Sequence, residues 1–225
     1  MALISSTGLS AEQKASWEAY GFLIVRNVLD ASECSEIDRL VSAEWDTKEG
    51  NDHVIDIATG PDAHQWFRLD QAPPNARNEV YKLNNLFARR ARIRELALKP
   101  ALKQTITGIL EGEPTICNSL NFERGSQQPY HLDTWFMPPP LEDRMVAVNI
   151  ALEDVDLENG PLTFYPGSHK IPYFKFSNGE TRYVPSEVSA CTDYLDEQVR
   201  QRALEPDLFI CKAGDAFIWL SLIHI

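Results

Sequence analysis

Polar and apolar positions follow a helical spacing over much of the first hundred residues. Ser10 and Gln13 form a capping-box pattern, in which the hydroxyl and the amide each satisfy a backbone group at the start of a helix. They predict a helix over residues 11–20 that ends at Gly21. Residues 22–28 (FLIVRNV) are rich in β-branched side chains, so they predict a strand.

The helical spacing returns after this strand. Asp30 with Glu33 repeats the capping pattern and predicts a second helix. Its apolar residues lie at the spacing of one helix face: Ile37, Leu40, Val41 and Trp45. Residues 78–110 predict two further helices broken near Pro100, because proline is tolerated in a first turn.

The second half has a different pattern, with short β-rich segments between turn residues. These segments are residues 114–122, 128–136, 144–152, 161–166 and 207–219, with a helical insert over 193–204. A helical front followed by antiparallel strands predicts an α+β protein whose scaffold is a sandwich or jelly roll. No flexible linker separates the halves, so we expect the helices to cover one sheet of a single domain.

Composition narrows the function classes. The 225 residues carry a formal net charge of −12, which disfavours nucleic-acid binding because phosphate backbones are also anionic. We find no apolar run of about 20 residues that could span a bilayer, and no secretory signal. The four cysteines are scattered, which is typical of buried thiols in a reducing cytosol, so we expect a cytoplasmic protein. The sequence gives no indication of the oligomeric state.

The most informative of the five histidines lies in QPYHLDTWF. If this segment is a strand, His131 and Asp133 point to the same side, because side chains alternate between faces. An imidazole and a carboxylate on one face are two thirds of the 2-His-1-carboxylate set that holds Fe(II). A surface histidine followed by a turn aspartate is the alternative interpretation of this tripeptide alone.

Further motifs follow in a fixed order. Asn159-Gly160-Pro161-Leu162 precedes Pro166-Gly167-Ser168-His169-Lys170, and Ala213-Gly214-Asp215 comes later, before an apolar strand. With the His-X-Asp tripeptide and the opening YGFLIVRNVLDASECSEI, this order resembles the phytanoyl-CoA dioxygenase (PhyH) family of Fe(II)/2-oxoglutarate oxygenases. The resemblance spans nearly the whole chain. It implies a double-stranded β-helix, the cupin-like jelly roll, with N-terminal helices packed on the sheet.

The resemblance also implies site residues. His131 and Asp133 match the first two iron ligands of the family. The residues that match or neighbour its 2-oxoglutarate contacts are Lys82, Asn121, Gln128 and Asn149. The alternative for Asn121 is a hydrogen-bonded strand amide, and for Lys82 a solvated helix lysine; Gln128 has the same ambiguity. Asn149 stands where relatives often carry tryptophan.

The function implied is hydroxylation of a small organic substrate by molecular oxygen, with Fe(II) as cofactor and 2-oxoglutarate as cosubstrate. The cosubstrate is oxidatively decarboxylated to succinate. Halogenating relatives have a small residue at the carboxylate position, so Asp133 favours hydroxylation. Two alternatives stay open: a non-catalytic small-molecule binding protein on the same fold, and a metal-dependent hydrolase using the same ligand types.

The remaining candidates have weaker patterns. His169 follows a turn, and we expect a structural or substrate-mouth role; His53 and His64 lie in a polar stretch and are expected to be solvated. Trp135 and Phe136 are candidates for a substrate wall or for the core. The segment after residue 170 is a candidate lid, with the side chains Tyr173, Phe174, Phe176 and Arg182.

The C-terminal residues raise a separate expectation. In the family pattern the distal histidine ligand lies ten residues after the aspartate of the Gly-Asp turn, whereas His224 lies nine residues after Asp215. Residues 220–225 (LSLIHI) resemble a reading frame of a transposase adapter sequence. We therefore expect one domain over residues 1–219, incomplete at its C-terminus, with 220–225 as a non-native tail. Such a chain would also lack the family's 2-oxoglutarate-binding arginine, bind iron weakly and turn over poorly. A genuine apolar terminal strand is the alternative.

Overall fold

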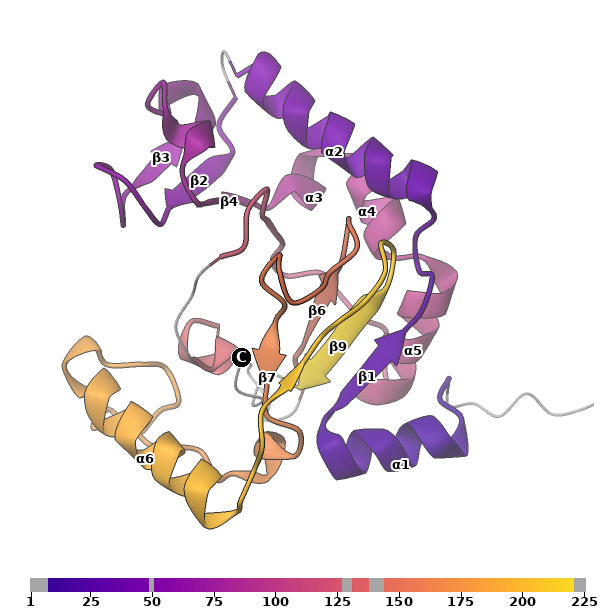
Figure 1. Ribbon diagram of the computed structural model, residues 1–225, viewed down its shortest axis with the longest axis vertical. Helices are drawn as coiled ribbons and strands as arrows, with labels where there is room; N and C mark the ends of the chain where they lie inside the picture. The colour runs from indigo at the N-terminus through magenta and orange to yellow at the C-terminus, as the bar shows by residue number, and fades with distance from the viewer. Residues whose placement is uncertain (1–7, 49–50, 127–130, 138–143, 221–225) are drawn as a thin grey trace, which may run out of the picture. The chain divides into compact units, whose positions relative to one another are not determined.

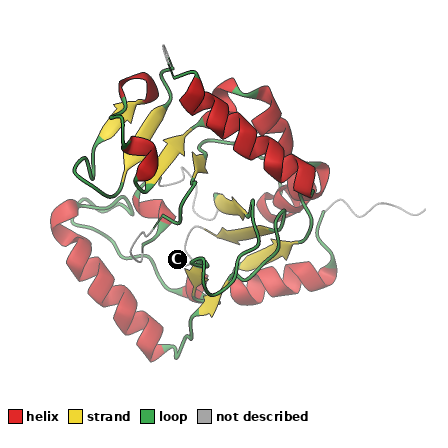
Figure 2. Ribbon diagram, turned by 45° about the horizontal axis from the view of Figure 1, so that its top comes forward, coloured by secondary structure: helices red, strands yellow, loops and turns green. Residues whose placement is uncertain are grey.

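The computed structural model describes residues 8–48, 51–126, 131–137 and 144–220. Its contacts divide the chain into two compact units. The first unit comprises Met1–Val28, Ala101–Pro114 and Pro129–Ile225, and the second comprises Leu29–Pro100 and Thr115–Gln128. Each combines helices with antiparallel strands, which confirms the predicted α+β class. The strands are short and joined by long loops (Figure 2).

The first unit is built around a three-stranded antiparallel sheet in the order β1-β9-β6 (Figure 1). Its strands are β1 (Phe22–Val25), β6 (Val146–Ile150) and β9 (Ala216–Leu220). A second pair consists of β7 (Thr163–Phe164) and β8 (Asp207–Leu208). The helices are α1 (Ala11–Tyr20), α5 (Pro100–Leu110, of which residue 100 belongs to the second unit) and α6 (Val188–Gln201). Three short 3-10 helices complete it: η3 (Asp133–Trp135), η4 (Ser168–Lys170) and η5 (Pro185–Glu187).

The start of the first unit follows the sequence prediction. Ser10 and Gln13 form the predicted capping box, and Gly21 ends α1 with a φ of 77°. A side chain at residue 21 would collide with the ring of His169, whose Nδ1 would lie 2.4 Å from a Cβ there. Glycine is therefore required for both its left-handed backbone and its lack of a side chain. His169 accordingly lies in η4 and packs against the end of α1, the structural role predicted for it.

Two apolar clusters fill the first unit. The first joins the sheet to β7 through buried aromatic side chains, chiefly Phe164, Phe209, Phe217 and Trp219. The second joins η3 to α6 through Leu132, Trp135, Cys191 and Leu195, together with Ile171 and Phe176. Phe174 also packs against this cluster, so the predicted lid contributes two of its aromatic side chains to the core.

The second unit holds a four-stranded antiparallel sheet in the order β3-β2-β4-β5. Its strands are β2 (Val54–Ile57), β3 (Trp66–Arg68), β4 (Tyr81–Asn84) and β5 (Leu120–Asn121). Its helices are α2 (Ala31–Asp46), α3 (Leu86–Arg89) and α4 (Ala91–Ala97), with short 3-10 helices η1 (Leu69–Gln71) and η2 (Ala76–Asn78). Helix α2 packs Val41 against Ile55, Ile57 and Leu83, as expected for a helix covering a sheet.

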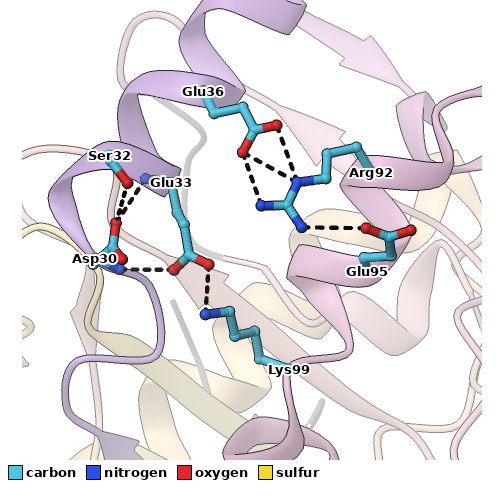
Figure 3. A network of polar contacts seen from close by, with 7 residues as sticks. All are labelled: Asp30, Ser32, Glu33, Glu36, Arg92, Glu95 and Lys99. Carbon is cyan, nitrogen blue, oxygen red and sulfur yellow. Dashed lines mark hydrogen bonds and ion pairs between the residues drawn. The ribbon is translucent and has the colours of Figure 1, made fainter.

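Ion pairs join α2 to the segment around α4 (Figure 3). Asp30 caps α2 as predicted, accepting a hydrogen bond from the backbone N–H of Glu33. Glu33 pairs with Lys99 at 2.5 Å, and Glu36 receives the guanidinium of Arg92 at 2.9 Å. These carboxylates are paired with cations on α4 and on the residues that follow it, so they serve the structure of this unit.

Three parts of the sequence prediction are wrong. Residues 81–84 form strand β4, where helix was predicted, because they pair with β2 on one side and β5 on the other. His53, predicted to be solvated, is buried. Cys117 is exposed, while the other three thiols are buried as predicted. None of the described helices is long and apolar enough to cross a membrane.

Candidate metal centre

His131 and Asp133 lie on a turn. The predicted strand is wrong for residues 131–136, because the N–H groups of Trp135 and Phe136 donate to carbonyls three residues back, at Leu132 and Asp133. A backbone that bonds to itself in this way offers no ladder to a neighbouring strand. The expected side-by-side placement of the two side chains nevertheless holds, since His131 Nε2 lies 3.7 Å from Asp133 Oδ1.

Buried side chains fix the position of this turn. Leu132 and Trp135 are buried in the apolar cluster with α6, and Thr134 between them is fully buried. Burial raises the pKa of the neighbouring Cys191 thiol to about 11, so this thiol is protonated at neutral pH. It packs as an apolar side chain of the cluster. His131 and Asp133 project away from this cluster and retain 12% and 19% side-chain exposure. The turn therefore holds a partly exposed imidazole and a partly exposed carboxylate, and its position is fixed by the buried residues between and after them.

One oxygen of the carboxylate is held by an indole. Trp219 Nε1 donates to Asp133 Oδ2 at 3.0 Å. Trp219 is buried on β9, paired with Phe22 and Ala147 on either side, and its ring lies 5.3 Å from that of Phe217. The indole is therefore part of the rigid sheet, and it leaves Oδ1 as the oxygen that faces His131.

Sequence reasoning missed Trp219 as a site residue. The signal was available, because a buried indole N–H needs an acceptor and Trp219 follows the Gly-Asp turn of the family pattern. That turn is itself well fixed: Asp215 receives the guanidinium of Arg26 at 2.6 Å and the N–H groups of Asn27 and Lys212. It sets the start of β9, and through β9 the position of Trp219.

The donor pair fits a small divalent cation. A metal ion about 2.1 Å from each donor holds a nitrogen and an oxygen about 3.0–3.6 Å apart, so a shift of a few tenths of an ångström closes the pair on it. One imidazole and one carboxylate also match the ligand types of the 2-His-1-carboxylate iron set. Within the described ranges, no group of three or more His, Cys, Asp or Glu side chains is arranged so that it could hold a metal ion. The predicted candidate for the distal ligand, His224, lies outside those ranges.

The predicted cosubstrate residues are distributed over both units. Asn149 lies on β6 of the first unit, opposite Phe217 in the register. Lys82 lies on β4 of the second unit, with Nζ 3.5 Å from Asp56 Oδ2. Asn121 lies on β5 opposite Leu83, and its Oδ1 is buried without a hydrogen-bond partner in the described structure. Gln128 lies outside the described residues.

Lys82 and Asn121 project from opposite faces of their sheet. Directly paired residues of neighbouring strands share a face, so Asn121 shares the face of Leu83, which is fully buried in the apolar core. Lys82 is next to Leu83 along the strand and therefore faces the other way. One cosubstrate molecule does not reach both side chains across this sheet.

Comparisons with solved structures support the fold. The carbocyclase SnoK of nogalamycin biosynthesis, a non-heme alpha-ketoglutarate-dependent enzyme, is 19% identical with a TM-score of 0.70, covering 97% of this chain and 78% of its own. EctD from S. alaskensis, solved with 2-oxoglutarate and 5-hydroxyectoine, is 19% identical with a TM-score of 0.64, covering 99% and 71%. HygX from Streptomyces hygroscopicus, solved with nickel, 2-oxoglutarate and hygromycin B, is 14% identical with a TM-score of 0.58, covering 97% and 80%.

These likenesses confirm the predicted jelly-roll fold. The comparison with curated proteins gives no match. Residues 17–224 match the family model described as Phytanoyl-CoA dioxygenase (PhyH), which confirms the resemblance over almost the whole chain. The cofactors of that class are Fe(II) and 2-oxoglutarate, as predicted. The chain belongs to the phytanoyl-CoA dioxygenase (PhyH) family of non-haem Fe(II)/2-oxoglutarate-dependent oxygenases.

Proposed function

We propose that this protein hydroxylates a small organic substrate with iron held by His131 Nε2 and Asp133 Oδ1. The observation that carries the proposal is the convergence of these two atoms to 3.7 Å on a turn fixed by the buried side chains of Leu132 and Trp135. Fe(II) held there with 2-oxoglutarate would supply the oxidising chemistry with molecular oxygen as the oxidant: one oxygen atom would enter succinate as the cosubstrate loses carbon dioxide, and the other would enter the substrate. The protein supplies the geometry of that site.

Asp133 has two tasks in this proposal. Its Oδ1 provides negative charge and one ligand oxygen, while its Oδ2 stays with the Trp219 indole. Because Oδ2 accepts the indole N–H, Oδ1 is the oxygen that would hold iron together with His131, while the indole would orient the carboxylate. The presence of a carboxylate at this position also favours hydroxylation over halogenation.

The cosubstrate contacts follow as a weaker part of the proposal. Asn149 belongs to the same unit as the donor pair, so we place it first among the predicted contacts. Lys82 pairs with Asp56 at 3.5 Å, and its ammonium group has three N–H donors, so it can serve a second carboxylate without losing that partner. Asn121 offers a buried amide whose oxygen lacks a partner in the described structure. Gln128 remains a proposal from the sequence.

An anaerobic titration tests the proposal. Fe(II) and 2-oxoglutarate are added to the purified chain, and the metal-to-ligand charge-transfer absorption of the ternary complex is recorded. We expect a saturable band in the wild type, none in His131→Ala or Asp133→Ala, and an unchanged band in His64→Asn. His64 is an exposed histidine with a φ of 65°, which asparagine tolerates, so it is a matched control.

Admission of oxygen then separates the alternatives. Succinate formation that requires both Fe(II) and 2-oxoglutarate supports an oxygenase. A band without succinate indicates a binding protein. Turnover of ester or amide substrates with Zn²⁺, independent of oxygen and 2-oxoglutarate, would replace the proposal with a hydrolase. Absence of the band in the wild type contradicts the assigned ligands.

A further inference from the structure

The turn that carries the donor pair also carries a half-exposed aromatic side chain. Along residues 131–136, Leu132, Thr134 and Trp135 are buried, whereas Phe136 is 49% exposed. Both aromatic residues of this turn were candidates for the core or for a substrate wall. The structure separates them, because Trp135 belongs to the apolar cluster and Phe136 does not.

Phe136 is in contact with the donor pair. Its ring centroid lies 5.6 Å from that of His131, with the planes at 66°. On another side it lies 5.4 Å from the ring of Tyr183, with the planes at 62°. Both are edge-type contacts, the arrangement that aromatic rings prefer. The three rings form a continuous aromatic surface that begins at a candidate metal ligand, and we name it the His131–Phe136–Tyr183 wall.

The wall is held in place by the backbone. The N–H of Tyr183 donates to the carbonyl of Trp135 at 3.2 Å, so the segment after residue 170 is bonded to the turn at this point. Val184, the next residue, packs against the apolar cluster that also contains Trp135. Tyr183 itself keeps 36% exposure. Single exposed apolar residues are common on protein surfaces, but here two exposed aromatic rings contact each other, and one of them, Phe136, also contacts the imidazole of His131.

We propose that this wall is the substrate-contacting surface of the site and that the substrate presents a flat, apolar ring to Phe136. This inference rests on the proposed function for the position of the reacting carbon beside the metal. A planar ring can cover the exposed area of Phe136 while it keeps the edge contacts to His131 and Tyr183. A stacked pair of rings is more favourable than the burial of equal area by a saturated group, by roughly two- to twelvefold in affinity.

A matched pair of probes tests the wall. The probes are 2-naphthol and decahydro-2-naphthol, which share a carbon skeleton and a hydroxyl but differ in planarity. Binding of each to the purified full chain is measured by equilibrium dialysis, without added metal. We expect 2-naphthol to bind about two- to twelvefold more tightly than its saturated counterpart. Phe136→Leu retains an apolar side chain and should abolish that preference.

Tyr20→Leu is the matched control. Tyr20 is an exposed aromatic residue of the same unit, at the end of α1, and its replacement should leave both affinities unchanged. Mn²⁺ then tests whether the bound probe lies close to the proposed metal centre. If Mn²⁺ binds at His131 and Asp133, it should accelerate the proton relaxation of bound 2-naphthol. That acceleration should vanish in Asp133→Ala while the affinity for 2-naphthol stays.

The outcomes separate the two proposals. No saturable binding of 2-naphthol, equal affinity for the two probes, or an unchanged preference in Phe136→Leu overturns the wall. If 2-naphthol is preferred but Mn²⁺ does not accelerate its proton relaxation, the wall binds a ring. That result would contradict both the position of the wall beside a metal and the proposed ligands His131 and Asp133. Wild-type binding of Fe(II) and 2-oxoglutarate with no role for Phe136 supports the proposed function alone.

Discussion

Two histidine–carboxylate pairs of nearly equal separation occur among the described residues, one in each unit. His131 Nε2 lies 3.7 Å from Asp133 Oδ1, and His53 Nε2 lies 3.9 Å from Glu44 Oε2. The surroundings differ. Glu44 lies on α2, one of its oxygens receives the Arg90 guanidinium, and the other receives the Asn51 amide. Asp133 gives one oxygen to Trp219 and keeps the other directed at the imidazole.

The pKa values of the Glu44 pair show what its environment does. Burial raises the pKa of Glu44, but the hydrogen bonds from Arg90 and Asn51 together outweigh it, so the pKa lies below its usual range. Burial also lowers the pKa of His53, and the nearby Glu44 charge only partly opposes this. At neutral pH, His53 is therefore neutral and the counterion of Glu44 is Arg90. The two pairs have nearly the same separation, but the carboxylate of Glu44 is already neutralised by Arg90, whereas Asp133 forms no ion pair with a lysine or arginine of the described residues.

The largest expected effect is on metal binding by Asp133→Ala. Because this change removes a proposed ligand, Fe(II) affinity should fall at least about a hundredfold, beyond the effect typical of outer-shell partners. The free energy of unfolding should change little, since the side chain is partly exposed and outside the apolar cluster. Anaerobic Fe(II) titration and urea denaturation measure the two properties. Retention of wild-type affinity would remove Asp133 from the site.

Glu44→Ala should give the reverse result. The change leaves Arg90 and Asn51 without their buried acceptor, so we expect the free energy of unfolding to fall by about 2–3 kcal/mol, while Fe(II) affinity is unchanged. Glu95→Ala, at the exposed Arg92 pair on α4, is the control and should have little effect on unfolding (Figure 3). Urea denaturation of the three proteins measures this. A loss of iron binding in Glu44→Ala would show that the buried pair is not purely structural.

Trp219→Phe should have a smaller effect on the metal centre. The ring stays in the sheet, but the N–H that holds Asp133 Oδ2 is lost, so Fe(II) affinity should fall about tenfold. The 2-oxoglutarate charge-transfer band should also shift, because the freed carboxylate can bind through both oxygens. Trp66→Phe, on the exposed strand β3, should change neither. If Trp219→Phe keeps the wild-type Fe(II) affinity and the wild-type charge-transfer band, the indole has only a packing role.

The smallest expected effect is the acid dependence of stability due to His53. Its pKa is lowered from 6.5 by burial, so the unfolded chain takes up a proton at a higher pH than the folded chain does. This contribution to stability is fully present above about pH 6.5 and is lost as the pH falls through the folded pKa. His53→Gln should flatten the decline in unfolding free energy below pH 6.5. Denaturation at several pH values measures it, and equal slopes would contradict a depressed His53 pKa.

Local signals predicted the helix starts well and the short strands poorly. The capping boxes at Ser10 and Asp30 are complete within four residues, so the sequence alone contains all the groups that form them. Strands such as β2 and β4 gain their stability from pairing with each other across more than twenty residues, and a polar residue such as Lys82 within β4 hides the pattern. Their existence depends on partners that local reasoning does not see.

The proximity of His131 and Asp133 was predictable for the same reason that the caps were. His131 and Asp133 are two residues apart, so their proximity survives even though the predicted strand is a turn. Trp219 was missed because its contact with Asp133 joins distant parts of the chain. His53 was expected to be solvated from its polar neighbours, but the acids and bases around it pair with one another and bury it. The roles assigned to Gln128 and to the 220–225 tail stay predictions.

Strand β9 gives the first unit a particular order of assembly. It lies between β1 and β6 and follows both in the chain, so neither of these strands has this partner until residues 216–220 have left the ribosome. Such non-local pairing slows folding, and β1 must remain open in the meantime. Because the same strand carries the indole that binds Asp133, the donor pair reaches its final alignment only after β9 has paired with its neighbours.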